Sequence, residues 1–144
     1  MSTEENKAVG RRVVEEVANQ GNMAAADALF TADYVDHTAP PGLPPGLEGF
    51  KMFFTAFRAA FPDVHYHIED EIAEGDMVVH RLMGHGTMKG DFQGMPATGK
   101  SATWGEMHIG RFVGGKIAEH WANVDQLGML QQLGLAPMPG QGGG

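Results

Sequence analysis

Residues 101–125 read SATWGEMHIGRFVGGKIAEHWANVD, and this stretch decides the fold. Two runs that alternate apolar and polar residues flank the dipeptide Gly114-Gly115. Glycine accepts the positive φ angles that a two-residue β-hairpin loop requires. The sequence therefore predicts strands over residues 101–113 and 116–124, joined as an antiparallel hairpin.

A two-residue loop also fixes the register of a hairpin. Val113 is expected opposite Lys116, and counting along both strands from this pair assigns each side chain to one face of the sheet. One face should carry Trp104, Glu106, His108, Trp121, Asn123 and Asp125. The opposite face should carry Arg111, Ile109, Met107, Ala118, His120 and Ala122.

Two more strands precede the hairpin. Val64, Tyr66 and Ile68 alternate with polar residues, which is the period of a strand with one buried side. Gly75-Asp76 supplies a turn, and residues 77–88 read as the next strand. Four strands in sequence order predict an antiparallel meander.

Helices are predicted before and after these strands. Ser2 and Glu5 have the spacing of a capping box, so a first helix is expected over residues 3–19, followed by a short one over residues 23–30. Residues 47–61 predict a helix with a phenylalanine face, and a short helix should start near Gln126. Core packing explains the phenylalanine face better than a ligand-binding aromatic box does, but Phe54 is kept as a candidate substrate contact. The Pro/Gly-rich residues 39–46 predict a loop of the kind that rims a pocket.

Composition limits the classes of protein and partner. The 144 residues suit a single α+β domain over residues 1–136 followed by a flexible Gly/Pro tail over residues 137–144. A net charge of −8 argues against nucleic acid as a partner. No apolar run is long enough to span a bilayer, so no membrane partner and a cytoplasmic location are expected.

Metal binding receives little support. The chain has no cysteine, so any metal site would need histidines and carboxylates. His65 and His67 have the spacing of two ligands on one face of a strand, but no third ligand is evident nearby. We expect a solvent-facing pair here and no metal site.

Asp125 has two interpretations. Beside tryptophans on a concave sheet face, a carboxylate can act as a general base, with His108 and Glu106 holding or sharing the proton. Asp125 also directly precedes the helix expected near Gln126, where aspartate is a favoured N-cap residue. A carboxylate turned toward the backbone of residues 126–128 would favour a role without catalysis.

Several segments resemble the SnoaL-like polyketide cyclases. They are the runs at residues 34–37, 61–63, 74–81, 86–87, 94–100, 111–112, 115–121 and 125–128. The resemblance implies a fold similar to nuclear transport factor 2, in which a curved, cone-shaped antiparallel sheet wraps around N-terminal helices and encloses a deep apolar pocket. It also implies an intramolecular aldol ring closure without metal or cofactor.

By motif position, the resemblance implies that Asp125 is the catalytic acid/base, that His108 assists it and that His37 lies in the pocket. Trp104, Glu106, Trp121, Asn123 and Phe54 complete the candidate substrate contacts. One motif departs from the family, because many relatives have Gly-Thr-His where this chain has Gly86-Thr87-Met88. A hydrophobic small-molecule substrate and a homodimer or higher homo-oligomer are the implied partners.

Two alternatives to the cyclase stay open. One is another proton-transfer enzyme of the same fold: an isomerase, a dehydratase or an epoxide hydrolase. Epoxide opening is disfavoured because Arg111 is expected on the face opposite Asp125. The other is a binding module that holds a hydrophobic ligand without catalysis.

Overall fold

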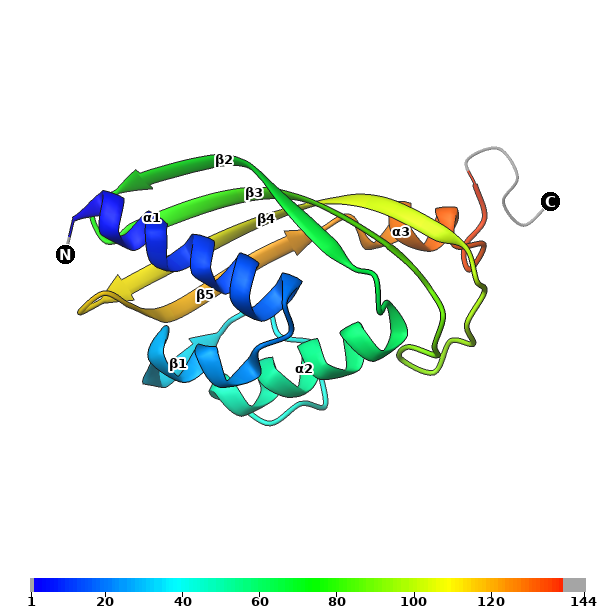
Figure 1. The fold of residues 1–144 in the computed structure, drawn as a ribbon, viewed down its shortest axis with the longest axis horizontal. Helices are drawn as coiled ribbons and strands as arrows, with labels where there is room; N and C mark the ends of the chain where they lie inside the picture. The colour runs from blue at the N-terminus through cyan, green and yellow to red at the C-terminus, as the bar shows by residue number, and fades with distance from the viewer. Residues whose placement is uncertain (1, 139–144) are drawn as a thin grey trace.

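A computed structural model describes residues 2–138 of the chain. It contains a curved, unclosed five-stranded sheet in the order β1-β5-β4-β3-β2 (Figure 1). The strands are β1 (Phe30–Asp36), β2 (His65–Glu74), β3 (Met77–Thr87), β4 (Ser101–Val113) and β5 (Lys116–Val124). Strands β2 to β5 pair in sequence order and antiparallel, which confirms the predicted meander and the α+β fold class.

Strand β1 adds an edge that the meander did not include. It runs parallel to β5, with Phe30 opposite Ile117 and Asp36 opposite His120. Residues 34–37, one of the runs that resemble the family, largely fall within this strand, whose pairing was not predicted. Because β1 joins the sheet beside β5, it brings Asp36 next to the last hairpin.

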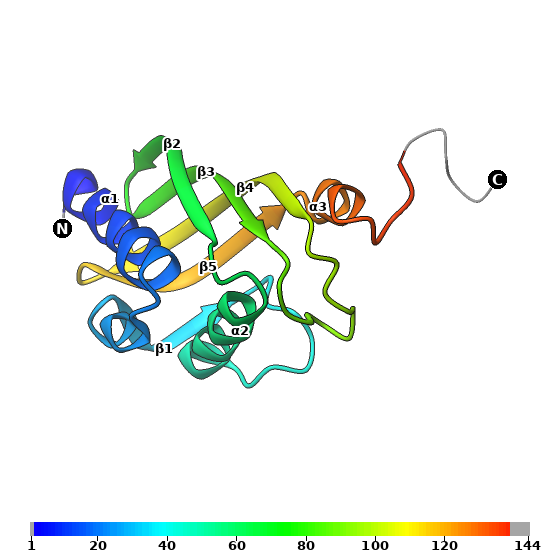
Figure 2. The same ribbon diagram turned by 45° about the vertical axis from the view of Figure 1, so that its right-hand side comes forward.

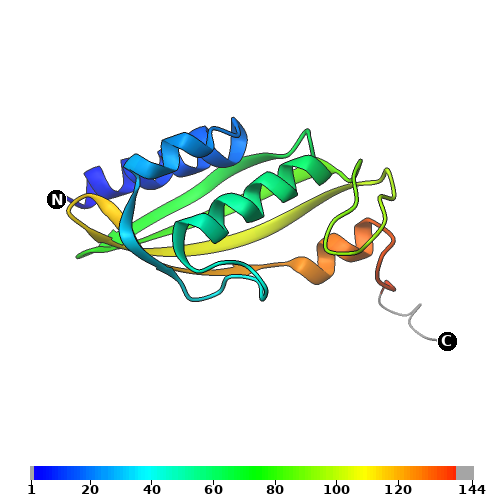
Figure 3. The ribbon, with the colours of Figure 1, turned by 90° about the horizontal axis from the view of Figure 1, so that it is seen from below.

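The helices that precede β2 lie on the concave side of the sheet. Helix α1 (Thr3–Arg12) begins at the predicted capping box, and the chain continues as the π-helix η1 (Val13–Asn19) and the 3-10 helix η2 (Met23–Ala28). Figures 2 and 3 show α1, η1 and α2 (Gly46–Ala60) against the same side of the sheet. The short α3 (Gln126–Gln132) lies beyond the end of β5. None of the helices in residues 2–138 is both long and apolar enough to cross a membrane.

Two apolar clusters join the helices to the sheet. The first centres on Phe57, Phe61 and Trp104, whose rings contact one another edge-on or stacked. The second centres on Phe30 and Phe112 under η1 and η2. Burying an aromatic side chain stabilises the folded state by about 1.5–3 kcal/mol. The two clusters therefore stabilise the packing of the helices on the sheet.

The register of the last hairpin differs from the prediction. Val113 opposes Lys116 and Phe112 opposes Ile117 as expected, but Arg111 then opposes Glu119 because Ala118 is an extra residue in β5. Such a bulge moves every later side chain to the other face. His108 therefore opposes Ala122 instead of Trp121, and the face assignments of residues 119–125 were wrong.

Within the expected Gly/Pro tail at residues 137–144, residues 139–144 lie outside the described part of the chain. The helix that precedes the tail ends near Gly134, whose φ of 80° suits the end of a helix.

Candidate active site

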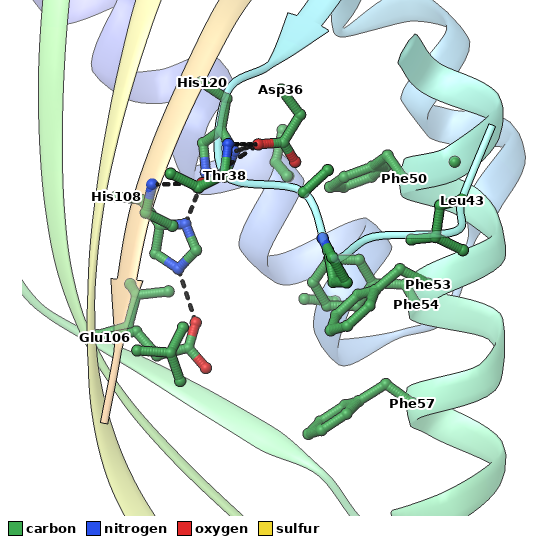
Figure 4. Close-up of a pocket in the computed structure, with 18 of the residues that line it drawn as sticks. Asp36, Thr38, Leu43, Phe50, Phe53, Phe54, Phe57, Glu106, His108 and His120 are labelled. Atoms are coloured by element: carbon green, nitrogen blue, oxygen red, sulfur yellow. Dashed lines mark hydrogen bonds and ion pairs between the residues drawn. The ribbon is translucent and has the colours of Figure 1, made fainter. Parts of the chain in front are cut away.

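A cavity of about 510 Å³ lies between α2 and the concave face of β3, β4 and β5. This volume is in the range of small-molecule sites. One wall carries Phe50, Phe53, Phe54 and Phe57 from α2 (Figure 4). The rest of the lining is mostly apolar and includes the loop over residues 38–46, Met88, Phe92 and Met95.

The opposite wall carries a continuous chain of polar side chains. His108 Nε2 lies 2.7 Å from Glu106 Oε1, and His108 Nδ1 lies 2.8 Å from His120 Nε2. His120 Nδ1 then lies 3.2 Å from Asp36 Oδ1. Figure 4 shows this chain facing the phenylalanines of α2 across the cavity. We call Glu106, His108, His120 and Asp36 the tetrad.

Trp104 fixes the position of the Glu106 carboxylate. Its second oxygen, Oε2, accepts a hydrogen bond from Trp104 Nε1 at 2.7 Å, and the carboxyl group is buried. Burial, together with the charge of Glu106, raises the pKa of nearby Tyr66. Because both oxygens of Glu106 already accept hydrogen bonds, its orientation is fixed and it holds the His108 ring in place.

Asp36 is the other end of the tetrad. Burial alone would raise the pKa of Asp36, but His120 and the hydrogen bonds from Thr38 outweigh burial and lower it. The amide nitrogen of Thr38 donates to Asp36 Oδ1 at 3.1 Å, and the Thr38 hydroxyl lies 3.3 Å from the same oxygen. Asp36 therefore carries a negative charge at neutral pH.

His120 is poised as a base. Burial lowers the pKa of His120 and neighbouring His108 lowers it further, while Asp36 acts in the opposite direction without reversing the shift. The ring is therefore neutral at pH 7 and carries one N–H. His120 Nδ1 is buried, and the nearest charged atom is Asp36 Oδ1 at 3.2 Å.

The contacts allow two neutral tautomer arrangements of the two rings. In one of them His108 donates from Nε2 to Glu106, and its Nδ1 accepts from the Nε2–H of His120. That arrangement leaves the lone pair on His120 Nδ1 vacant beside the Asp36 carboxylate. A proton taken up there forms an ionic hydrogen bond with Asp36, which favours uptake.

The structure places the sequence-predicted site residues in two groups. Phe54, Glu106 and His108 line the cavity, and Trp104 lies directly behind Glu106. His37, Trp121, Asn123 and Asp125 do not line it. His37 and Trp121 stack on the outer side of the sheet with ring centroids 4.7 Å apart, and His37 Nε2 lies 2.9 Å from Glu119 Oε1.

Asp125 is exposed and caps helix α3. Its Oδ1 accepts a hydrogen bond from the amide of Gly128 at 3.0 Å, which is the orientation that disfavours catalysis by this residue. Arg111 was expected on the face opposite Asp125, yet it lies on the same outer face and bonds Glu119. The bulge at Ala118 causes both differences.

Sequence reasoning missed Asp36 and His120. His120 was assigned to the outer face by the uncorrected register. Asp36 lies two residues after buried Tyr34 and so shares its face, and it precedes the loop expected to rim a pocket. That alternation was a usable signal for Asp36, whereas a bulge leaves no clear mark in a single sequence.

His65 and His67 lie on β2, away from this cavity, with ring centroids 4.6 Å apart. Within residues 2–138, no three His, Asp or Glu side chains are arranged to hold a metal ion.

Comparisons with known proteins agree on one family. The model of the family described as SnoaL-like polyketide cyclase matches residues 8–133. The aklanonic acid methyl ester cyclase DnrD of Streptomyces peucetius is 33% identical over 127 residues, covering 86% of this chain and 87% of that protein. The nogalonic acid methyl ester cyclase of Streptomyces nogalater is 32% identical over 118 residues, covering 81% of this chain and 88% of that protein.

Solved structures show the same fold. TsrD from Streptomyces laurentii superimposes with a TM-score of 0.86 at 24% identity, covering 94% of this chain and 98% of that one. IdmH from Streptomyces antibioticus gives a TM-score of 0.78 at 31% identity, covering 90% of this chain and 98% of that one. The chain belongs to the SnoaL-like polyketide cyclase family.

Proposed function

We propose that this chain is an acid/base cyclase that closes a ring in a polyketide-type substrate by an intramolecular aldol reaction, without a cofactor. The observation that supports this function best is the tetrad, a half-buried chain of proton-carrying groups on one wall of an apolar cavity. An apolar enclosure strengthens the interaction of charges within it and keeps water away from a reactive carbanion.

The reaction begins with proton removal. His120 Nδ1 takes a proton from a carbon next to a substrate carbonyl, which leaves an enolate and an imidazolium. Asp36, with its oxygen 3.2 Å away, stabilises the imidazolium. A positioned general base of this kind contributes on the order of 10²–10⁴-fold to the rate.

Ring closure then returns the proton. The enolate carbon attacks a second carbonyl of the same substrate, forming a carbon–carbon bond and an alkoxide. The alkoxide takes the proton from His120 Nδ1, which restores the neutral ring. The proton is conserved over the cycle and no electrons enter or leave, so the chemistry needs no redox group.

His108 and Glu106 keep the base in the correct tautomer. The hydrogen bond between His108 and His120 fixes the proton of neutral His120 on Nε2, so that the lone pair is on Nδ1. Glu106 in turn fixes His108. His108 thus keeps a place in the proposed machinery, whereas the base is His120 and no longer Asp125.

The aromatic wall holds the substrate against the tetrad. Phe53 and Phe57 are stacked with centroids 5.9 Å apart, and Phe54 meets Phe53 edge-on at 5.3 Å. Flat conjugated rings pack well on such a surface. A polyketide with several fused rings would therefore lie along α2 and present its reacting side chain to β4 and β5.

The first experiment offers the protein the compounds named for its relatives, aklanonic acid methyl ester and nogalonic acid methyl ester. We expect at least one to be converted to an isomeric product of equal mass and different retention time. His108→Gln, which keeps a hydrogen-bonding side chain but cannot titrate, should slow conversion by about 10²-fold or more. Equal rates for the two proteins would contradict the proposal.

The second candidate is a binding module that holds a hydrophobic ligand without changing it. The observation that favours it is the cap made by Asp125, which removes from the cavity the residue that resemblance singled out. Tight binding of both esters, with no product after long incubation at high protein concentration, would support this function over the cyclase.

A homodimer or higher homo-oligomer stays a prediction, as does a cytoplasmic location. Met107, Ile109 and Val113 are exposed apolar residues on the outer face of β4, and they are the surface to test. Sedimentation of the protein and of Met107→Lys would show whether this face joins copies of the chain.

A further inference from the structure

Besides His120 Nδ1, a second buried polar atom of a cavity-lining residue has no hydrogen-bond partner, and this atom is the hydroxyl oxygen of Tyr34. Tyr34 lines the cavity and is only 3% exposed, and its hydroxyl oxygen is buried with no hydrogen bond. A buried polar group left without a partner is destabilising, and native structures contain few of them. Such a group in a ligand-sized cavity indicates a ligand that would satisfy it.

The Tyr34 ring is held firmly. It meets Phe30 edge-on with centroids 4.6 Å apart, and it meets Phe50 edge-on at 6.4 Å. Both neighbours belong to the packed wall between β1 and α2. The hydroxyl therefore has little freedom to seek another partner.

Tyr34 lies on the same strand as Asp36, two residues earlier and on the same face. Burial raises the pKa of the Tyr34 hydroxyl, and the charge of Asp36 and the interaction of the hydroxyl with that side chain raise it further, so the group stays protonated and can donate. His120 Nδ1, which pairs with Asp36, is the vacant acceptor of the same cavity. One donor and one acceptor without a geometric hydrogen-bond partner thus belong to residues that line the same cavity as Asp36.

We propose that Tyr34 is a further catalytic residue, which donates its hydroxyl hydrogen bond to the carbonyl oxygen that becomes the enolate oxygen. This inference rests on the proposed function and adds an electrophilic group to it. A carbon acid next to a carbonyl needs an acceptor for its proton and a donor for its oxygen, and these are the two vacancies. A hydrogen bond to developing negative charge in an apolar site stabilises the transition state more than the ground state.

Tyr34→Phe isolates the hydroxyl. The ring and its contacts with Phe30 and Phe50 remain, and removing an unsatisfied hydroxyl from the interior is neutral or stabilising. We therefore expect a melting temperature no lower than that of the wild type. Thr31→Val is the matched control, because Thr31 Oγ1 is also buried without a partner but does not line the cavity.

A binding measurement tests the donor without any turnover. The probes are 2-naphthol, whose hydroxyl can accept from Tyr34 and donate to His120, and naphthalene, which has no polar atom. Titration calorimetry should show that Tyr34→Phe weakens 2-naphthol binding by about tenfold, the effect of one hydrogen bond, and leaves naphthalene unchanged. Thr31→Val should bind both probes as the wild type does. Equal affinity of the wild type and Tyr34→Phe for 2-naphthol, or an equal loss for both probes, would overturn the proposal.

Turnover supplies an independent readout. With a substrate that the wild type converts, Tyr34→Phe should lower kcat by about 10²–10³-fold and change KM little. An unchanged kcat would show that Tyr34 is not catalytic while the proposed function stands. If the wild type converts nothing, the proposed function fails, and the naphthol comparison still decides whether the hydroxyl is a donor to ligands.

Discussion

The two faces of the β4–β5 hairpin carry the same kinds of side chain in different settings. On the outer face, Glu119 bonds both Arg111 and His37 at the solvent-exposed surface, and these two partners lower the pKa of Glu119. On the cavity face, the tetrad makes similar pairs between side chains that are less exposed and lie against an apolar cavity. Exposed ion pairs contribute little, whereas enclosed ones shift proton affinities and persist. Enclosure, and not residue type, separates the candidate active face from the other.

One residue decides which side chains belong to which face. Without the extra residue Ala118, the strand period would turn Trp121, Asn123 and Asp125 inward and His120 outward. The bulge is thus as important to the candidate site as the titratable residues are.

Deleting Ala118 should have the largest effect. The deletion would turn Glu119 and Trp121 toward the cavity and His120 toward solvent. We therefore expect the free energy of unfolding to fall by more than about 4 kcal/mol and all activity to be lost. Urea unfolding followed by circular dichroism measures the loss. Ala118→Gly, which keeps the bulge, should cost about 1 kcal/mol, and a deletion variant as stable as this control would contradict the role given to the bulge.

Replacing the proposed base should come next. His120→Gln keeps a donor toward His108 but has no nitrogen that can be protonated at the position of Nδ1. We expect kcat to fall by about 10²–10⁴-fold, with the fold intact by circular dichroism. Outer-face His37→Gln is the control and should keep at least half of the wild-type rate. A His120→Gln enzyme with wild-type kcat would remove His120 from the mechanism.

Acid should destabilise the protein through buried histidines. Burial lowers the pKa of His80, although its partner Glu71 acts against the shift, and burial likewise lowers that of His120. Below the ordinary histidine pKa of about 6.5 the unfolded chain binds protons that the folded chain does not. Stability therefore decreases as the pH decreases, until the pH reaches the lowered pKa of these histidines in the folded chain.

The expected slope in that window is at most about 1.4 kcal/mol per pH unit for each histidine. Urea midpoints at pH 7.5, 6.5 and 5.5 measure it. His80→Gln should flatten the dependence, since one of the two groups is gone. A midpoint that rises as pH falls from 7.5 to 5.5 would show that these rings gain protons on folding.

The smallest effect belongs to the outer-face carboxylate. Asp125→Ala removes the N-cap of α3 and should cost about 1 kcal/mol, seen as a lower melting temperature. Asp125→Asn should keep nearly all of the stability, because asparagine caps a helix about as well. Equal losses in the asparagine and alanine variants would mean that the charge, and not the cap, matters, because both variants lack the charge and only asparagine keeps the cap.

Sequence patterns predicted most of the fold. The Gly114-Gly115 turn and the alternation of residues 64–88 gave the meander, and the phenylalanine spacing gave α2. Edge strand β1 was missed as a sheet member because parallel pairing joins residues 30–36 to residues 117–120, far away in sequence. The periodicity of a short segment does not predict which distant strand it pairs with.

The candidate site was predicted in part. Glu106, His108 and Phe54 were assigned correctly to the concave side, since they lie on β4 and α2, where the periodicity is unbroken. The residues on β5 were not, because alternation beyond a bulge is displaced by one position. Asp125 drew attention through its motif, and a motif does not show which way a side chain points.

The most direct test applies one chemical change to both faces. Asp36→Asn and Asp125→Asn each replace a carboxylate with a neutral amide of the same shape, one beside His120 in the cavity and the other at the cap of α3. Both variants and the wild type are assayed for kcat on the same cyclisable ester. We predict a loss of about 10²-fold or more for Asp36→Asn and a rate within twofold of the wild type for Asp125→Asn. The reverse result, with Asp125→Asn inactive and Asp36→Asn unaffected, would contradict the assignment of the acid/base chemistry to the cavity face.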